Sequence, residues 1–253
     1  MSRILHLIPN TLGESPLEIA LPQGLIEVVR NLKFFVVENE KSARKFLKMC
    51  GVMPPFEGVE MYVLDKHSTQ QDMFGILKLL KDHEVGVLSE AGCPAIADPG
   101  ADLVLLAHEQ GMEIRPYVGP SSILLALMGA GFNGQGFTFH GYLPVPQQER
   151  IAKLKELENL SAQTTHTQVF IETPFRNEAL LADMLKNCAP ETLLSVSYNL
   201  TLPDQKIITK PIEKWQDTKV ELRGKPAVFC LWRRPFKEKK GKYDKGRNRD
   251  FMS

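Results

Sequence analysis

Short apolar runs alternate with longer amphipathic stretches along most of the chain, and this pattern predicts an α/β protein. Val85–Leu88 is apolar throughout, as is typical of a strand that is buried on both faces of a parallel sheet. We therefore expect largely parallel sheets covered by helices. The predicted strands are 4–8, 34–37, 85–88, 114–118, 137–142, 168–172, 193–199 and 227–232, and the predicted helices are 25–31, 42–50, 71–81, 121–128, 149–160 and 178–188.

The pattern divides the chain into two α/β units and a terminal segment. We expect an N-terminal domain at residues 1–117 and a C-terminal domain at residues 118–232. After Trp232 the apolar content falls sharply, so residues 233–253 are expected to form a flexible basic tail. A literal G-x-G-x-x-G at 129–134 follows a helical run rather than a strand, so we interpret it as a helix terminus.

The distribution of charge along the chain says more about function than the bulk composition does. The chain has 253 residues, 43% hydrophobic and 24% charged, and a formal net charge of +1. Residues 233–253 hold nine basic and three acidic side chains, so they carry +6 while residues 1–232 carry −5. A strongly basic body, which is typical of nucleic-acid binders, is therefore excluded.

Other bulk features narrow the functional class further. The four cysteines form no C-x-x-C pair and the histidines lack zinc spacing, so we expect no metal site. No signal peptide and no apolar stretch of about 20 residues is present, so we expect a cytoplasmic protein with no membrane partner.

Two loops have the composition of ligand-binding loops. The first follows the buried strand and reads Ser89-Glu-Ala-Gly-Cys-Pro-Ala-Ile-Ala-Asp-Pro-Gly100 before an apolar helix, which Asp98 is expected to cap. The second reads Val118-Gly-Pro-Ser-Ser122 before another helix. Loops at the carboxyl ends of parallel strands bind ligands in open α/β sheets, although many such loops are only connectors.

These segments resemble a known family. The first loop resembles the S-D-A-G-T-P-x-I-S-D-P-G signature of the tetrapyrrole methylase superfamily, and the second resembles L-P-G-P-S-A of its branch that methylates a ribose 2′-hydroxyl of small-subunit ribosomal RNA. Three later blocks are similar to F-x-G-F-L-P, F-Y-E-S-P-H-R and K-G-E-x-V-L of that branch; they are Phe139-His-Gly-Tyr-Leu-Pro144, Phe170-Ile-Glu-Thr-Pro-Phe-Arg176 and Gly224-Lys-Pro-Ala-Val-Phe229.

The resemblance implies a methyltransferase of two α/β/α domains, a homodimer, with S-adenosylmethionine in a cleft between the domains. Carried over by position, the cofactor contacts implied in this chain are Ile8, Cys93, Pro94, Ile96, Ser121, Ser122, Ile171 and Ala227. An adenine needs apolar walls, and the ribose and methionine parts need hydrogen-bonding groups, which agrees with this set.

Other segments depart from the branch and bear on the substrate. Where the branch has A-T-P-I-G-N, this chain has Pro9-Asn-Thr-Leu-Gly-Glu14, and where it has E-D-T-R, this chain has Glu38-Asn-Glu-Lys41. The branch sequence H-N-E is replaced by His67-Ser-Thr69, and E-L-T-K with a following H-E is replaced by Asn199-Leu-Thr-Leu-Pro-Asp-Gln205. The cofactor-facing segments are the more similar ones. The overall match and the basic tail make ribosomal RNA the first substrate hypothesis. The acidic body and the altered loops favour the second, a tetrapyrrole or other small molecule.

The catalytic group is not assigned by the sequence. A hydroxyl acceptor benefits from a general base, and the candidates are Glu38, Glu90 and Glu172, with Glu40 a further carboxylate nearby in sequence. Each could equally be a solvated or loop-capping carboxylate. A third hypothesis, from another class, is a non-catalytic nucleic-acid-binding or regulatory module.

Overall fold

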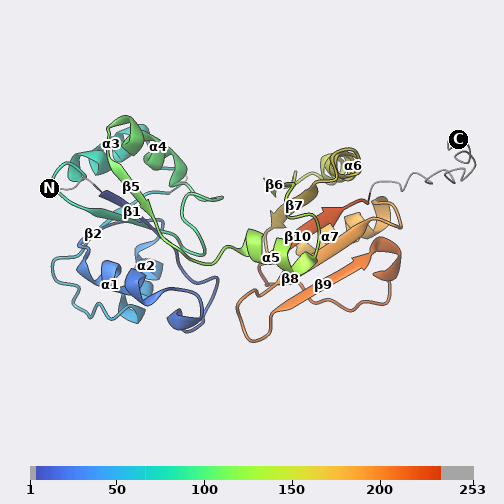
Figure 1. Cartoon of the computed structure of the whole chain (residues 1–253), viewed down its shortest axis with the longest axis horizontal. Coiled ribbons are helices and arrows are strands. Elements are labelled where there is room, and N and C mark those ends of the chain that lie inside the picture. Colours follow the sequence, from blue (N-terminus) through green and yellow to red (C-terminus); the bar gives the residue numbers. More distant parts are fainter. Residues whose placement is uncertain (1–3, 66, 235–253) are drawn as a thin grey trace, which may run out of the picture.

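The computed structural model describes residues 4–65 and 67–234, which form two five-stranded sheets that follow one another along the chain (Figure 1). The first sheet has the order β3-β2-β4-β1-β5, and all its pairings are parallel. Its strands are β1 (Ile4–Ile8), β2 (Phe34–Val37), β3 (Glu60–Val63), β4 (Val85–Leu88) and β5 (Glu113–Pro116).

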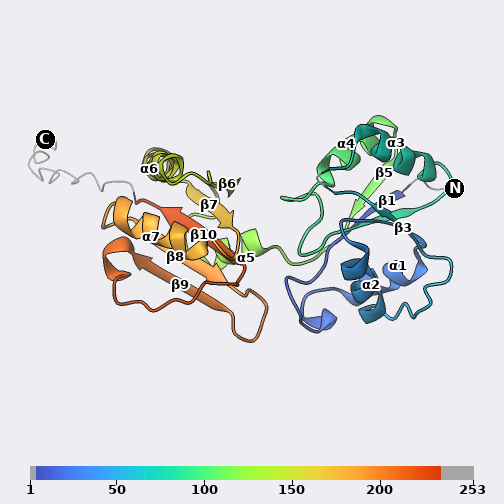
Figure 2. The ribbon, with the colours of Figure 1, turned by 180° about the vertical axis from the view of Figure 1, so that it is seen from behind.

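Helices cover both faces of the first sheet because its central strands are apolar on both sides. α1 (Gln23–Asn31) and α2 (Glu40–Met49) pack on one face, and α3 (Gln70–Leu79) and α4 (Ala101–Glu109) pack on the other (Figure 2). Phe35 and Val36 are adjacent on β2 and point to opposite cores, as the two-residue period of a strand requires. This first unit is therefore a three-layer α/β/α domain.

The second sheet has the order β6-β7-β10-β8-β9, and here only the β6–β7 pairing is parallel. Its strands are β6 (Phe137–Tyr142), β7 (Thr167–Glu172), β8 (Leu193–Tyr198), β9 (Lys206–Pro211) and β10 (Ala227–Trp232). The expectation of a largely parallel sheet is thus wrong for this half, because β10 runs back between β7 and β8.

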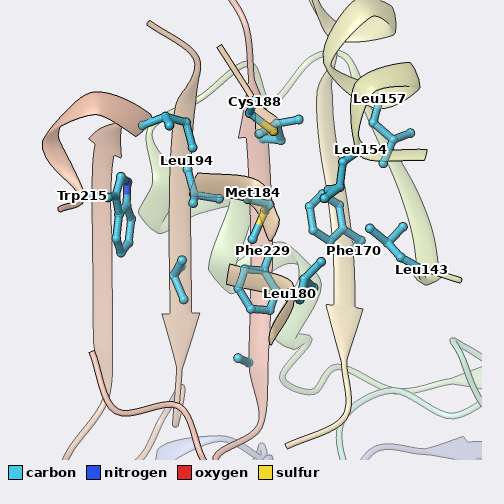
Figure 3. Close-up of a cluster of buried hydrophobic side chains, with 14 of the residues drawn as sticks. Leu143, Leu154, Leu157, Phe170, Leu180, Met184, Cys188, Leu194, Trp215 and Phe229 are labelled. Atoms are coloured by element: carbon cyan, nitrogen blue, oxygen red, sulfur yellow. The ribbon is translucent and has the colours of Figure 1, made fainter. Parts of the chain in front are cut away.

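The second sheet also lies between two helical layers. α5 (Ser122–Ala130) packs on one face, and α6 (Gln147–Thr164) and α7 (Asn177–Asn187) pack on the other. Figure 3 shows the core on the α6–α7 side, where Phe170 and Phe229 from adjacent strands stack with ring centroids 5.9 Å apart. A buried ion pair from Arg150 to Asp183, 2.6 Å long, joins α6 to α7.

The remaining differences from the predicted elements are local. β3 and β9 are not among the predicted strands, and both are edge strands. The helix after the first loop begins at Ala101, with Gly100 as its N-cap; Asp98 instead accepts a hydrogen bond from the Gly100 amide at 2.9 Å. Gly131 ends α5 in a left-handed conformation, φ 70°, which agrees with a helix terminus at the G-x-G-x-x-G segment. In the described parts of the chain, no helix combines the length and the hydropathy needed to cross a membrane.

Candidate functional site

Three loops meet at the carboxyl edge of the first sheet. They follow β1, β4 and β5, which are neighbours in the sheet order, so the strand topology brings their ends together. Asn10 and Gly92 exchange two backbone hydrogen bonds, of 2.9 and 3.1 Å, and thereby join the loop after β1 to the loop after β4. The Asn10 side-chain amide also donates to the Ser89 and Glu90 carbonyls, at 3.2 and 3.1 Å.

The loop after β5 is held against the other two by close backbone approach. A Cβ on Gly119 would lie 2.3 Å from the Pro9 ring, and one on Gly92 would lie 3.3 Å from the Pro120 carbonyl oxygen. Gly92 also has φ +74°, a conformation that favours glycine. Cys93 Sγ lies 3.5 Å from the same Pro120 oxygen. The loop residues are therefore fixed relative to one another.

A cavity of about 210 Å³ lies where these loops face the second sheet, and we call it the interdomain cavity. Its walls are mostly apolar and come from both domains. The lining residues are Leu12, Ala91, Ser122, Tyr142, Ile171, Glu172, Pro174, Ser197, Leu200, Pro226, Ala227 and Val228. Three of the cofactor contacts implied by the family resemblance are thus brought together here: Ser122, Ile171 and Ala227.

A second, larger cavity of about 540 Å³ lies between the loop after β1 and helix α2, and we call it the α2 cavity. Ser42, Lys45, Phe46 and Met49 of α2 form one side, and residues 10–16 form the other. Leu12 lines both this cavity and the interdomain cavity, and Ala91 does too. The two cavities therefore adjoin.

The remaining implied contacts occupy different environments. Ile8 is 0% exposed and packs in the core below the loops, so only its backbone could reach a ligand. Ser121 is the N-cap of α5, and its hydroxyl accepts from the Leu124 amide at 3.4 Å. Pro94 is buried, whereas Ile96 is 55% exposed. None of these residues, nor Cys93, is among the lining of the interdomain cavity.

The three candidate bases lie at different places. Glu90 lines the α2 cavity, and Glu172 lines the interdomain cavity. Glu172 Oε1 accepts from the Thr173 amide and from Arg176, both at 2.6 Å, so this side chain holds the start of α7. Glu40 is ion-paired to Arg44 at 2.8 Å on the surface of α2.

Glu38 belongs to a group of carboxylates at the ends of adjacent strands. Glu38 follows β2 and Glu90 follows β4, and together with Asp65 they line a third cavity of about 270 Å³. Partial burial, a hydrogen bond with Asp98, and repulsion from Asp98 and Glu90 raise the pKa of Glu38 to about 7. Near neutral pH this carboxyl group can therefore hold a proton, which an ordinary glutamate does not.

Cys93 does not have the properties of a nucleophile. Burial raises the pKa of its thiol above the ordinary value of 9.0, so the thiol stays protonated at neutral pH. In the structure the thiol donates a weak hydrogen bond to the Pro120 carbonyl oxygen.

The sequence interpretation missed several cavity residues, of which Ser197 is the most informative. Its hydroxyl oxygen is buried and has no hydrogen-bond partner among the described residues, yet the residue lines the interdomain cavity. A signal existed in the sequence: Ser195 and Ser197 alternate with apolar residues along β8, which places both hydroxyls on one face of the sheet.

Comparisons with known proteins identify the family of the chain. The family model for tetrapyrrole (corrin/porphyrin) methylases matches residues 21–216. The ribosomal RNA small subunit methyltransferase I of Vibrio cholerae is 28% identical over 83% of this chain and 69% of its own length.

Solved structures share the fold. The methyltransferase CobJ superposes with a TM-score of 0.61 at 19% identity, covering 92% of this chain and 94% of its own. The uroporphyrin-III C-methyl transferase from Thermus thermophilus, solved as a complex with S-adenosylhomocysteine, gives 0.54 at 16% identity, covering 91% and 97%. With a family match over most of its length, the chain belongs to the tetrapyrrole (corrin/porphyrin) methylases and is a methyltransferase.

Proposed function

We propose that this chain transfers a methyl group from S-adenosylmethionine to a ribose 2′-hydroxyl of small-subunit ribosomal RNA. The observation that carries the proposal is the pair of adjoining cavities, which provides one site for a donor and a larger one for an acceptor. The name of the relative from Vibrio cholerae supports the choice of acceptor, and the family match together with the S-adenosylhomocysteine bound in a solved neighbour supports the choice of donor.

The interdomain cavity fits the adenosyl part of the donor. Ile171, Leu200 and Val228 offer apolar walls for a base, and the unpartnered Ser197 hydroxyl offers a hydrogen bond that the protein itself does not use. We assign Ser122, Ile171, Ser197 and Ala227 to this site. When bound, S-adenosylmethionine supplies a methyl group that is already activated by its sulfonium.

The chain's own task is to align the acceptor, exclude water and receive a proton. We assign Glu90 as the group that takes the hydroxyl proton, because among Glu38, Glu90 and Glu172 it is the one that lines the α2 cavity. Glu38 lines the third cavity together with Glu90, and its pKa, raised to about 7 by burial and by the carboxylates of Asp98 and Glu90, lets it hold a proton near neutral pH. Glu172 holds the start of α7 in place instead.

The proposal is tested in two steps. A ligand that binds the folded state raises the melting temperature, so millimolar S-adenosylhomocysteine is expected to stabilise the chain. Transfer of a labelled methyl group is then compared between small ribosomal subunits and a porphyrinogen.

Each outcome selects one hypothesis. Label in ribosomal RNA supports the proposal, and label in the porphyrinogen alone would replace it with a small-molecule methyltransferase. No stabilisation and no transfer would leave a non-catalytic module.

We also propose that the chain works as a homodimer in the cytoplasm. α5 and the segment before it support a dimer, because Val118, Leu124 and Met128 are 77%, 50% and 75% exposed although all three are apolar. Equilibrium sedimentation is expected to give twice the chain mass of 28.5 kDa, and Met128→Lys is expected to lower it. A wild-type chain that sediments at 28.5 kDa would contradict the dimer.

A further inference from the structure

Helix α2 presents a row of four basic side chains to solvent. Lys41, Arg44, Lys45 and Lys48 are spaced i, i+3, i+4 and i+7, which places them on one side of a helix. All four are exposed. The opposite side of the helix, with Ala43, Phe46 and Leu47, is buried in the core of the first domain. We call the four residues the α2 basic row.

Part of the charge of this row is available to a partner. Arg44 pairs with Glu40 and lies over the Phe56 ring, 5.9 Å from its centroid, and Lys45 pairs with Glu14. Within the described ranges, Lys41 and Lys48 form no ion pair. The helix carries four basic residues and a single acidic one, so it is cationic although the domain body as a whole is acidic.

The α2 basic row lies next to the α2 cavity, which is the proposed acceptor site. Lys45 belongs to the row and also lines the α2 cavity, and this cavity adjoins the interdomain cavity through Leu12 and Ala91. A polymer that lies along the row can therefore place one of its units in the α2 cavity, next to the donor site.

We propose that the α2 basic row binds the phosphate backbone of the RNA whose nucleotide enters the α2 cavity. This inference rests on the proposed function and names the surface that holds its substrate. From Lys41 to Lys48 the helix rises about 10 Å, which matches about three phosphates of a stacked strand at about 3.4 Å each.

The chemistry of the row favours RNA over a membrane. A helix that binds a lipid surface must expose apolar residues beside its basic ones. On α2 Ala43, Phe46 and Leu47 are already covered by the domain core, which leaves Met49, 42% exposed, as the one large apolar side chain of the helix that is open to solvent.

The test uses the full chain and two matched double variants. Lys41→Gln with Lys48→Gln removes two charges from the row, and neither residue lines a cavity described above. Lys78→Gln with Lys81→Gln removes two exposed charges, one in the last turn of α3 and one just after it, on the opposite face of the first sheet. Binding of a fluorescent single-stranded RNA of about 20 nucleotides is measured by anisotropy between about 50 and 200 mM salt.

The row variant is expected to bind RNA roughly tenfold more weakly at the lowest salt. The slope of log affinity against log salt is expected to fall in magnitude by about 1.4, because each phosphate that is no longer neutralised removes about 0.7. The α3 variant is expected to stay within about twofold of wild type, because a surface charge far from the bound RNA is screened by salt. An unchanged slope in the row variant, or an equal loss in both variants, would overturn the inference.

Two further measurements separate the remaining outcomes. Both variants are expected to bind S-adenosylhomocysteine as the wild type does, so a wild type that fails to bind it contradicts the proposed function rather than the row. Vesicles of anionic lipid are expected not to bind the chain. If they bind it with the same salt slope, and if that binding is lost in the row variant, the partner of the row would be a lipid surface rather than RNA.

Discussion

At the scale of single residues, the contact between Gly119 and Pro9 determines how closely the loops after β1 and β5 can approach. No side chain fits at Gly119, since a Cβ there would lie 2.3 Å from two carbons of the Pro9 ring. A proline ring cannot rotate away as a flexible side chain can. The closeness of the two loops therefore depends on this glycine.

Gly119→Ala is expected to lower the free energy of unfolding by about 2 kcal/mol, the usual cost of forcing an extra carbon into a packed site. Gly24→Ala is the matched control, because nothing lies within 4 Å of the added carbon and alanine favours the α1 helix. Urea unfolding of both variants measures the difference. Equal stability of the two would contradict the close approach.

The raised pKa of Glu38 gives the stability of the fold a pH dependence. Its pKa rises from 4.5 to about 7 on folding, so the folded state holds the proton more tightly than the unfolded state. The stabilisation is complete below pH 4.5 and is lost as the pH rises through about 7.

Glu38→Gln mimics the protonated side chain, so we expect the variant to be more stable than wild type at pH 8. The expected difference is about 1 kcal/mol, because Glu38 is only partly buried and solvent screens its charge. The difference should shrink toward pH 5. Urea unfolding at both pH values measures it, with exposed Glu27→Gln on α1 as the control. A stability difference that does not vary with pH would count against the raised pKa of Glu38.

Single residues also mark a limit of sequence interpretation. The Asp98-Pro99 pair has the composition of a helix start, yet the helix begins at Ala101. Ala95 and Ala97 adopt φ values of 64° and 58°, so the loop coils tightly before the helix can begin. Alanine carries no sequence signal for that conformation, which the surrounding loops impose.

At the scale of elements, most strands were predictable, and the two that were missed, β3 and β9, both lie at the edge of a sheet. β1, β2, β4 and β10 have the predicted bounds, because each is a largely apolar run, and β6 has them because its aromatic residues alternate with polar or small ones. β3 and β9 pair on one side only and alternate less clearly, with Glu60 at the start of one and Lys206 at the start of the other. The direction of the strands in the second sheet could not be predicted from local sequence patterns either, because it depends on how β10 inserts between β7 and β8.

The alternation along β8 gives a prediction for the candidate site. Ser197→Ala removes a buried hydroxyl without a partner, so stability is expected to stay equal or to rise by up to about 1 kcal/mol. Affinity for S-adenosylhomocysteine is expected to fall about fivefold, the loss of one hydrogen bond. Calorimetric titration measures the affinity.

Ser195→Ala is the control on the same strand and face. Its hydroxyl is hydrogen-bonded to Thr209 Oγ1 at 2.9 Å, so it should lose stability and keep its affinity for the ligand. Unchanged ligand affinity in Ser197→Ala would remove Ser197 from the proposed site.

At the scale of the whole molecule, the site combines residues that are distant in sequence. Ser122, Ile171 and Ala227 could be named in advance only by likeness to a family, whereas Leu12 and Ser197 needed the packing of two domains to bring them to one cavity. The predicted basic tail, residues 233–253, lies almost wholly outside the described residues. Arg233 still belongs to the packed domain, since its amide donates to Ser161 Oγ at 3.0 Å.

The sequence of residues 235–253 gives a prediction for substrate capture. These residues contain seven basic and three acidic side chains. Replacing the seven basic residues by glutamine is expected to weaken RNA binding. The slope of log affinity against log salt is expected to fall by about 0.7 for each phosphate that the variant no longer neutralises. Anisotropy with the same RNA measures both effects, and glutamine keeps the chain length unchanged. Equal binding before and after would assign the segment to solubility alone.

The hydrogen bonds between Asn10 and Gly92 have a consequence for how such an enzyme can change its substrate. They tie together two of the loops that form the donor side, while α2 takes no part in that bridge and contributes side chains to the acceptor side alone. The two bridged loops thus line both cavities, whereas α2 belongs to the acceptor side alone. New acceptors can arise by altering the surface of α2, with the methyl donor and the fold inherited unchanged.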